Sequence, residues 1–200
     1  MEAVLVYAGT VTFAVAGGLV AVQKRFDLIG VLILAGVTAI GGGSIRDVVA
    51  GIIPPTSLTS EPLLWTVFVT GLAVFTLHRF VPAGRTLYLA DTISLGIFAA
   101  LGAERGLEVG FGFWGVVFAG AVSGVGGGAI RDVLSGEVPG VLYRSGDFYA
   151  SAAAIGAAVT FALHQVDTTL AVVVGAAVAI AVRLGSRLAG LELPVPRTET

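Results

Sequence analysis

The chain has 200 residues, of which 56% are apolar and only 12% are charged. Soluble domains carry about 25% charged residues, and a mean hydropathy of +0.97 is too high for a chain with a wetted surface. The absence of cysteine excludes disulfide scaffolds and thiolate metal sites, and a net charge of −2 argues against a nucleic-acid partner. The composition predicts an integral membrane protein that lies almost entirely in the bilayer.

Charged residues divide the chain into apolar stretches of membrane-crossing length, about 20 residues each. Six stretches carry no charge and a seventh is interrupted only by Asp91: 3–23, 28–45, 62–78, 86–103, 109–130, 148–166 and 168–182. The runs do not alternate as membrane strands do. We therefore predict an all-α integral membrane protein with seven transmembrane helices.

The basic residues are distributed unevenly between the two sides that seven spans define. One side collects Lys24, Arg25, Arg79, Arg85, Arg144, Arg187 and Arg197, with Arg183 close by, whereas the other collects only Arg105. Because Lys and Arg accumulate on the cytoplasmic side, we expect the N-terminus outside and the C-terminus in the cytoplasm.

An internal repeat organises the sequence. Residues 30–54 and 115–139 align without a gap at an offset of 85, and 12 of the 25 positions are identical. Each unit holds three spans, so the second unit enters the membrane inverted, as in many transport proteins. We expect a single transmembrane domain over 1–190, with repeat 1 at about 1–82, repeat 2 at about 86–166 and an extra helix at about 168–188. Residues 191–200 are expected to form a tail.

The repeated core is Gly-Gly-Gly-x-Ile-Arg-Asp-Val, in the second span of each unit. Glycine costs about 1 kcal/mol relative to alanine in a helix interior. The triplets therefore predict a kink or break near mid-membrane, although close helix packing is the alternative. Freed backbone groups at such a break could line a path between the two repeats.

An Arg-Asp pair follows each triplet. A charge inside the hydrocarbon costs at least about 2.5–3.5 kcal/mol, so it faces a partner, the bundle interior or water. Neighbouring residues on a helix point about 100° apart, so we do not expect Arg46 to pair with Asp47. Pairing between the repeats, or with Asp91 and Asp147, is the expectation. These charges either brace the two halves or contact ions, and the two roles are compatible.

No nucleophile–base pair, metal-ligand cluster or phosphate-binding loop is recognisable. We therefore expect no enzyme activity, no cofactor and no metal site. The hydroxyls of Tyr7 and Thr10 in the first span and of Tyr88, Thr92 and Ser94 in the fourth could line an aqueous path, and Asp91 is a candidate for cation attraction.

The paired motifs on an inverted three-plus-three repeat with a seventh helix resemble the prokaryotic TRIC family, the trimeric intracellular cation channels, over the chain up to Leu188. The resemblance implies a homotrimer in a prokaryotic inner membrane, with a potassium-permeable pore in each protomer between kinked helices 2 and 5, less selective for sodium, and membrane lipids as partners. The implied ion pathway comprises Gly41, Gly42, Gly43, Arg46, Asp47, Gly126, Gly127, Gly128, Arg131 and Asp132. We add Thr38, Ser44, Ser123 and Asp91 as polar candidates on the same spans.

Three functions follow from these features. The first is a monovalent cation channel, in which Arg46 and Arg131 are held by acids or swing away when the pore opens. The second is a secondary transporter for glycine or a similar zwitterion, because the motif also resembles bacterial relatives thought to take up glycine. The third is a structural bundle in which glycines and charges only pack.

Overall fold

The structure is a computed structural model that describes residues 1–142 and 147–194, and these residues form an all-helical bundle. The α-helices are α1 (Glu2–Gln23), α2 (Leu28–Val49), α3 (Thr56–Thr59), α4 (Glu61–Leu77), α5 (Ala83–Glu108), α6 (Phe113–Leu134), α7 (Ala150–Leu163) and α8 (Thr168–Leu188). Two short 3₁₀ turns, η1 (His78–Phe80) and η2 (Gly140–Leu142), follow α4 and α6. The all-α prediction is confirmed.

All seven expected helices are present, and α3 is an additional short helix after α2. Six of the described helices are long and apolar enough to cross a membrane, whereas α7 has 14 residues. At 1.5 Å per residue α7 is about 21 Å long, shorter than the hydrocarbon core of a bilayer. The basic residues Arg144 and Arg197 and most of the expected tail, 195–200, lie outside the described residues.

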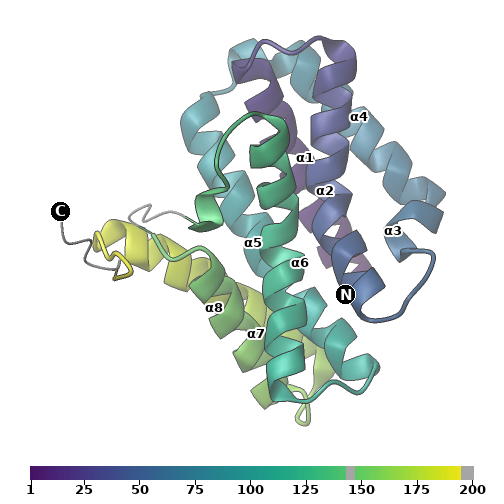
Figure 1. Cartoon of the computed structure of the whole chain (residues 1–200), viewed down its shortest axis with the longest axis vertical. Helices are drawn as coiled ribbons and strands as arrows, with labels where there is room; N and C mark the ends of the chain where they lie inside the picture. Colours follow the sequence, from purple (N-terminus) through teal and green to yellow (C-terminus); the bar gives the residue numbers. More distant parts are fainter. Residues whose placement is uncertain (143–146, 195–200) are drawn as a thin grey trace, which may run out of the picture.

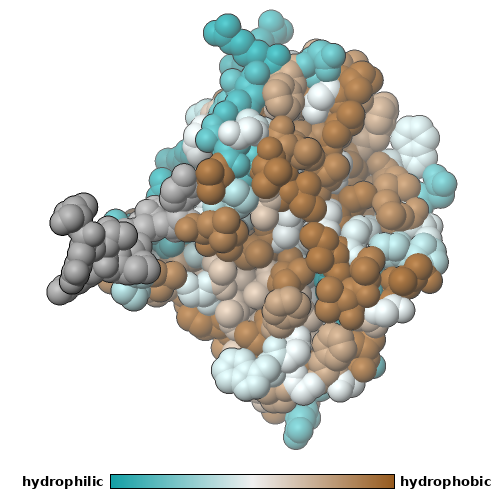
Figure 2. Space-filling model, viewed as in Figure 1, coloured by the Kyte–Doolittle hydropathy of each residue, from teal (hydrophilic) through white to brown (hydrophobic). Residues whose placement is uncertain are grey.

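The helices alternate in direction, so the two ends of the bundle carry different segments (Figure 1). The N-terminal face holds the start of α1, the ends of α2 and α5, and α3. The opposite, C-terminal face holds the α1–α2 loop, the ends of α6 and α8, and the start of α5. A broad apolar surface separates polar groups at the two ends (Figure 2). Such an exposed apolar belt suits lipid rather than water as the surrounding medium.

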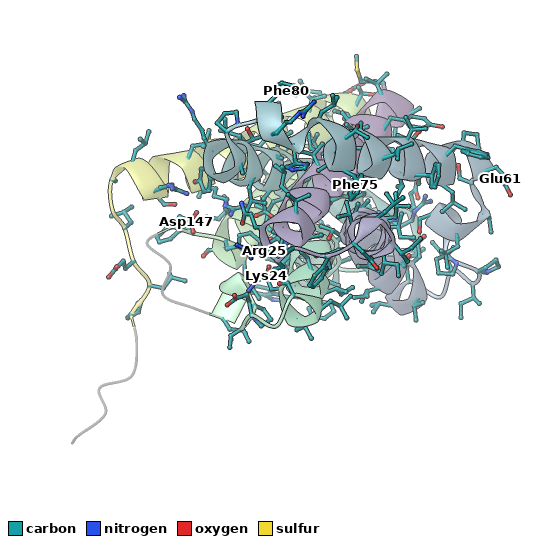
Figure 3. All side chains as sticks on the ribbon, turned by 90° about the horizontal axis from the view of Figure 1, so that it is seen from above. Lys24, Arg25, Glu61, Phe75, Phe80 and Asp147 are labelled. Atoms are coloured by element: carbon teal, nitrogen blue, oxygen red, sulfur yellow. The ribbon has the colours of Figure 1, made fainter. Side chains whose placement is uncertain are left out.

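The C-terminal face collects the basic residues that the sequence placed together, and Figure 3 shows two of them, Lys24 and Arg25, side by side. Lys24 forms an ion pair with Glu137 at the end of α6, which joins the first repeat to the second. The uneven charge is therefore a property of the fold, and the orientation of the two faces in a membrane stays a prediction.

The two glycine triplets meet where α2 crosses α6 at the centre of the bundle. A Cβ added to Gly42 would lie 2.3 Å from the carbonyl oxygen of Ser123, and one added to Gly127 would lie 2.1 Å from that of Thr38. The two contacts are related by the repeat offset, since Gly127 corresponds to Gly42 and Ser123 to Thr38. The crossing therefore lies on the pseudo-two-fold axis of the inverted repeat.

The predicted break of the second and fifth spans is wrong, because α2 and α6 are α-helical throughout their triplets. An interrupted helix would expose backbone groups that find no water in lipid, whereas a continuous helix keeps them bonded and uses the missing side chains for close approach. The alternative interpretation, helix packing, accounts for Gly42 and Gly127. A kink of either helix axis stays a prediction.

The repeat extends to packing that the aligned motif did not cover. A Cβ on Gly17 would lie 2.5 Å from the carbonyl oxygen of Leu34, and one on Gly102 would lie 2.8 Å from that of Ala119. Each glycine lets the first helix of its repeat approach the second. Together these contacts seat α1 on α2 and α5 on α6 in the same way.

Alanine substitutions in one triplet test the crossing. Gly42→Ala and Gly127→Ala force a methyl group into a backbone carbonyl, and we expect each to lower the free energy of unfolding by about 2–4 kcal/mol. Gly43→Ala is the matched control, because its Cβ would meet nothing closer than 3.8 Å and alanine favours the helix by about 1 kcal/mol. Unfolding of the purified protein in detergent measures the difference. Equal stability of the three variants would contradict the crossing.

Candidate functional site

A cavity of about 320 Å³ opens at the N-terminal face, between α1, α2, α4 and α5. Exposed Glu2 and Glu108 lie at its mouth, whereas the buried Thr10 and Gly43 lie deep inside. Its polar lining residues are Glu2, Tyr7, Thr10, Arg46, Thr56, Ser57, Ser60, Glu104, Arg105 and Glu108. The cavity thus leads from the polar end of the bundle to the first glycine triplet.

Arg46 occupies the inner part of this cavity and is held by its neighbour in the sequence. Its Nε and Nη2 donate to Oδ1 of Asp47 at 2.9 and 2.6 Å. The expectation that these adjacent residues do not pair is wrong, because the long, flexible guanidinium side chain reaches back to the carboxylate next to it. Both side chains are buried, so the pair replaces the water that each charge would otherwise need.

Asp47 also fixes the segment that follows α2. Its Oδ2 accepts hydrogen bonds from the backbone N–H of Thr56 at 2.9 Å and from the Thr56 hydroxyl at 2.6 Å. Asp132 repeats this arrangement at the end of α6, where its Oδ2 accepts from the backbone N–H of Gly140 at 2.9 Å. The aspartates of the two motifs therefore brace the loops that follow the second helix of each repeat.

Arg131 has two acidic partners, and one comes from another helix. It pairs with Oδ1 of Asp132 at 2.9 Å and with Oδ1 of Asp91 on α5 at 2.5 Å. The expected pairing of a motif arginine with Asp91 is confirmed for Arg131. Among the described residues Arg46 forms an ion pair with Asp47 alone, and the residue of repeat 1 that corresponds to Asp91 is Val6.

Arg183 of α8 completes this network at the C-terminal face. Its Nη1 lies 2.8 Å from Oδ2 of Asp91 and its Nε lies 3.4 Å from Oδ2 of Asp147. Its guanidinium carbon also lies 4.3 Å from the centre of the Tyr149 ring, within cation–π range. Asp147 is therefore held by Arg183 and not by a motif arginine.

The network fills the place that corresponds to the cavity of the first repeat. Gly128 is the counterpart of Gly43, and a Cβ added to Gly128 would lie 2.3 Å from the Tyr149 hydroxyl oxygen. The same addition at Gly43 would meet Arg46 Nη2 only at 3.8 Å. The two halves of the repeat thus differ: the space is open beside α2 and filled beside α6.

The remaining predicted site residues lie outside the cavity. Of the 14 residues predicted for the ion pathway only Gly43 and Arg46 line it, while Gly41, Gly42, Gly126 and Gly127 lie at the helix crossing. The Thr38 hydroxyl donates to the carbonyl of Leu34 at 2.6 Å, and the hydroxyls of Ser44 and Ser57 lie 2.9 Å apart. Ser123 is fully buried, and its hydroxyl oxygen has no hydrogen-bond partner among the described residues.

Three residues that shape the two ends of the site are absent from the predicted site residues: Glu104, Tyr149 and Arg183. Glu104 directly follows the apolar stretch 86–103, as an acid in a loop after a span would. In the structure it belongs to α5 and is only 8% exposed. Arg183 was grouped with the interfacial basic residues, yet it is 5% exposed. The counterparts of Glu104 and Tyr149 in repeat 1 are leucines, and Arg183 lies outside the repeat, so the internal repeat gave no signal for them.

A metal centre has no candidate in the part of the chain that the structure describes. No group of three or more His, Asp or Glu side chains there is placed to hold a metal ion. The buried ionic groups other than Glu104 instead pair with one another, and the open space lies beside Arg46. Together, the apolar belt, the inverted repeat and the buried charges define a polytopic membrane protein of the kind that moves small solutes across the bilayer.

Comparisons with known proteins place the chain in a family. The family model described as "Glycine transporter" matches residues 3–79 and 88–165. A UPF0126 membrane protein of Deinococcus radiodurans is 45% identical over 94% of this chain and 89% of its own length. The UPF0126 inner membrane protein YadS of Escherichia coli K12 is 34% identical over 93% of this chain and 91% of its own length.

Solved structures match over the whole fold. A structure described as "Structural basis for conductance through TRIC cation channels" has a TM-score of 0.89 and 40% identity, covering 98% of both chains. The TRIC trimeric intracellular cation channel orthologue from Rhodobacter sphaeroides has a TM-score of 0.87 and 34% identity, covering 95% of this chain and 98% of its own. The chain therefore belongs to the prokaryotic TRIC family of UPF0126 membrane proteins, and the predicted membership is confirmed.

Substitution of the two motif aspartates leaves their arginine partners in different states of pairing. Asp47→Asn leaves Arg46 buried without a carboxylate partner among the described residues, whereas Asp132→Asn leaves Arg131 paired with Asp91. Since an unpaired buried charge costs about 3–5 kcal/mol, we expect Asp47→Asn to lower the unfolding free energy by about that amount and Asp132→Asn by about 1–2 kcal/mol. Unfolding titrations of both variants measure this order, and the reverse order would contradict it.

Proposed function

We propose that the protein is a monovalent cation channel, permeable to potassium, with a pore inside each protomer beside the α2–α6 crossing. The observation that carries the proposal is the cavity that leads from the N-terminal face to Gly43, together with a symmetry-related space that is filled by Tyr149 and Arg131. A path that is open at one end and closed at the other is what a closed channel of this symmetry requires. The two similar solved structures described above, both of TRIC channels, support it.

Carboxylates give this path its preference for cations. Glu2, Glu104 and Glu108 line the cavity against two arginines, and Arg46 is already neutralised by Asp47. A bare guanidinium would be a barrier to a cation. The ion pair with Asp47 therefore lowers the electrostatic barrier that Arg46 would otherwise present to a cation in the path.

We further infer that Arg183 is the closing element at the C-terminal face. Together with Arg131 it neutralises Asp91, and its guanidinium lies against the ring of Tyr149, whose hydroxyl occupies the space beside Gly128. Opening requires this side chain to leave Asp91, after which the carboxylate faces the path. Gating would then depend on the extra helix α8 and not on the repeat itself.

Assembly and orientation complete the proposal. We propose a homotrimer, because the orthologue from Rhodobacter sphaeroides is described as trimeric. The N-terminal face is placed outside and the C-terminal face, with Lys24, Arg25, Arg79, Arg85 and Arg187, in the cytoplasm of a prokaryotic cell, according to the positive-inside rule. The cavity mouth would then face the outside.

A second function, uptake of glycine or a similar zwitterion, is favoured by the description of the matching family model. Its structural support is that the cavity holds both an arginine and an unpaired acid and opens at one face only, as an alternating-access carrier does. Purified protein in liposomes separates the two functions. A channel gives potassium flux that rises without saturation in the millimolar range, and a carrier gives saturable, ion-coupled uptake of labelled glycine.

Arg183→Gln tests the closing element. The variant removes the guanidinium of the closing element, while Asp91 keeps its pair with Arg131. We therefore expect the protein to fold and the potassium flux in liposomes to rise at least severalfold. Arg187→Gln is the matched control, because Arg187 lies one turn further along α8, is exposed and contacts Tyr88. An Arg183→Gln flux equal to that of the wild type would contradict the assignment of Arg183 as the closing element.

A further inference from the structure

We propose that Glu104 binds a monovalent cation inside the N-terminal face and forms the first binding site of the path. The proposal rests on the proposed cation-channel function and names the site that recruits its substrate. Glu104 is 8% exposed, and no hydrogen bond or ion pair joins it to any of the described residues. A buried carboxylate without a fixed partner needs a counter-charge, or it must give up its own charge.

The arginines near Glu104 are already paired with other acids. Arg105, the next residue, forms its ion pair with Glu108 at 2.6 Å. Arg46, across the cavity, directs Nε and Nη2 to Asp47. Neither guanidinium forms an ion pair with Glu104, so a charged Glu104 is open to a cation from outside the chain.

Side chains with oxygen atoms are among those that line the cavities beside Glu104. Thr10 lines the same cavity, is fully buried, and its hydroxyl oxygen has no partner among the described residues. Glu104 also lines a second cavity of about 210 Å³, together with Glu2, Thr168 and Thr169. Carboxylate and hydroxyl oxygens are the ligands that hard cations prefer. Glu104 thus lies between two spaces that offer such oxygens.

The arrangement fits a monovalent cation better than a divalent one. Tight divalent sites use several carboxylates on one ion, and no cluster of three acidic or histidine side chains in 1–142 or 147–194 is placed to hold a metal. A single carboxylate with hydroxyl groups balances one positive charge. It also binds weakly enough for the ion to leave, as conduction requires.

Thermal unfolding of the purified full chain tests the site without any need for current. At fixed ionic strength, potassium chloride replaces N-methylglucamine chloride, and we expect the Tm of the wild type to rise by about 2–4 °C. Glu104→Gln, which is isosteric but uncharged, should lose this rise. Glu61→Gln, an exposed acid outside the cavity on the same face, should keep it. Thr10→Val should reduce it, because it replaces the unpartnered hydroxyl with a methyl group.

Two outcomes would overturn the site: a wild-type Tm that does not respond to potassium, or a Glu104→Gln variant that keeps the full rise. Single-channel conductance at low potassium chloride gives the second readout, and we expect Glu104→Gln to lower it at least twofold relative to Glu61→Gln. If no variant passes current while the potassium-dependent Tm rise depends on Glu104, the channel function fails and the cation site stands. If currents are normal and equal in both variants, the site fails and the channel stands.

Discussion

The contact between the two glycine triplets is the constraint on which the rest of the structure depends. Gly42 and Gly127 bring the backbones of α2 and α6 so close that a methyl group on either would strike a carbonyl oxygen. In lipid, apolar side chains gain little by contacting one another instead of acyl chains, so close backbone packing is a main source of association. The crossing sets the distance between the repeats, and through it the positions of α1 and α5, which pack on α2 and α6 in the same manner.

The two repeats differ in the half-sites beside α2 and α6, where the proposed ion path lies. The second helix of each repeat ends in an Arg-Asp pair that holds the following loop, but only repeat 2 supplies Asp91, and only α8 supplies Arg183. A seventh helix has no counterpart in an inverted pair of three-helix units, so it is the element that can make the two halves different. Its arginine pairs with Asp91 and packs on Tyr149, which fills one half-site, whereas the other half-site is open. A fully symmetric bundle of the two three-helix repeats, without α8, would have both half-sites open or both closed.

The sequence predicted the helices, the inverted repeat and the importance of the two motifs, because apolar length and internal identity are properties of the chain itself. It misjudged the triplets, since three glycines disfavour a helix in water but permit close packing in a bundle. It also misjudged Arg46 and Asp47, because the direction of a Cβ does not limit a side chain as long as arginine. The burial of Glu104 and Arg183 could not be predicted from the sequence, because burial of a single charge that the repeat does not duplicate depends on how the helices pack.

The most direct test of the central claim is the current through single protein molecules in a planar bilayer under a potassium chloride gradient. A cation channel predicts discrete current steps that reverse near the potassium equilibrium potential and not near that of chloride. Substituting sodium on one side then gives the selectivity from the shift of the reversal potential. Wild-type and Arg183→Gln protein that are both silent, in vesicles that take up labelled glycine saturably, would contradict the channel and favour the carrier.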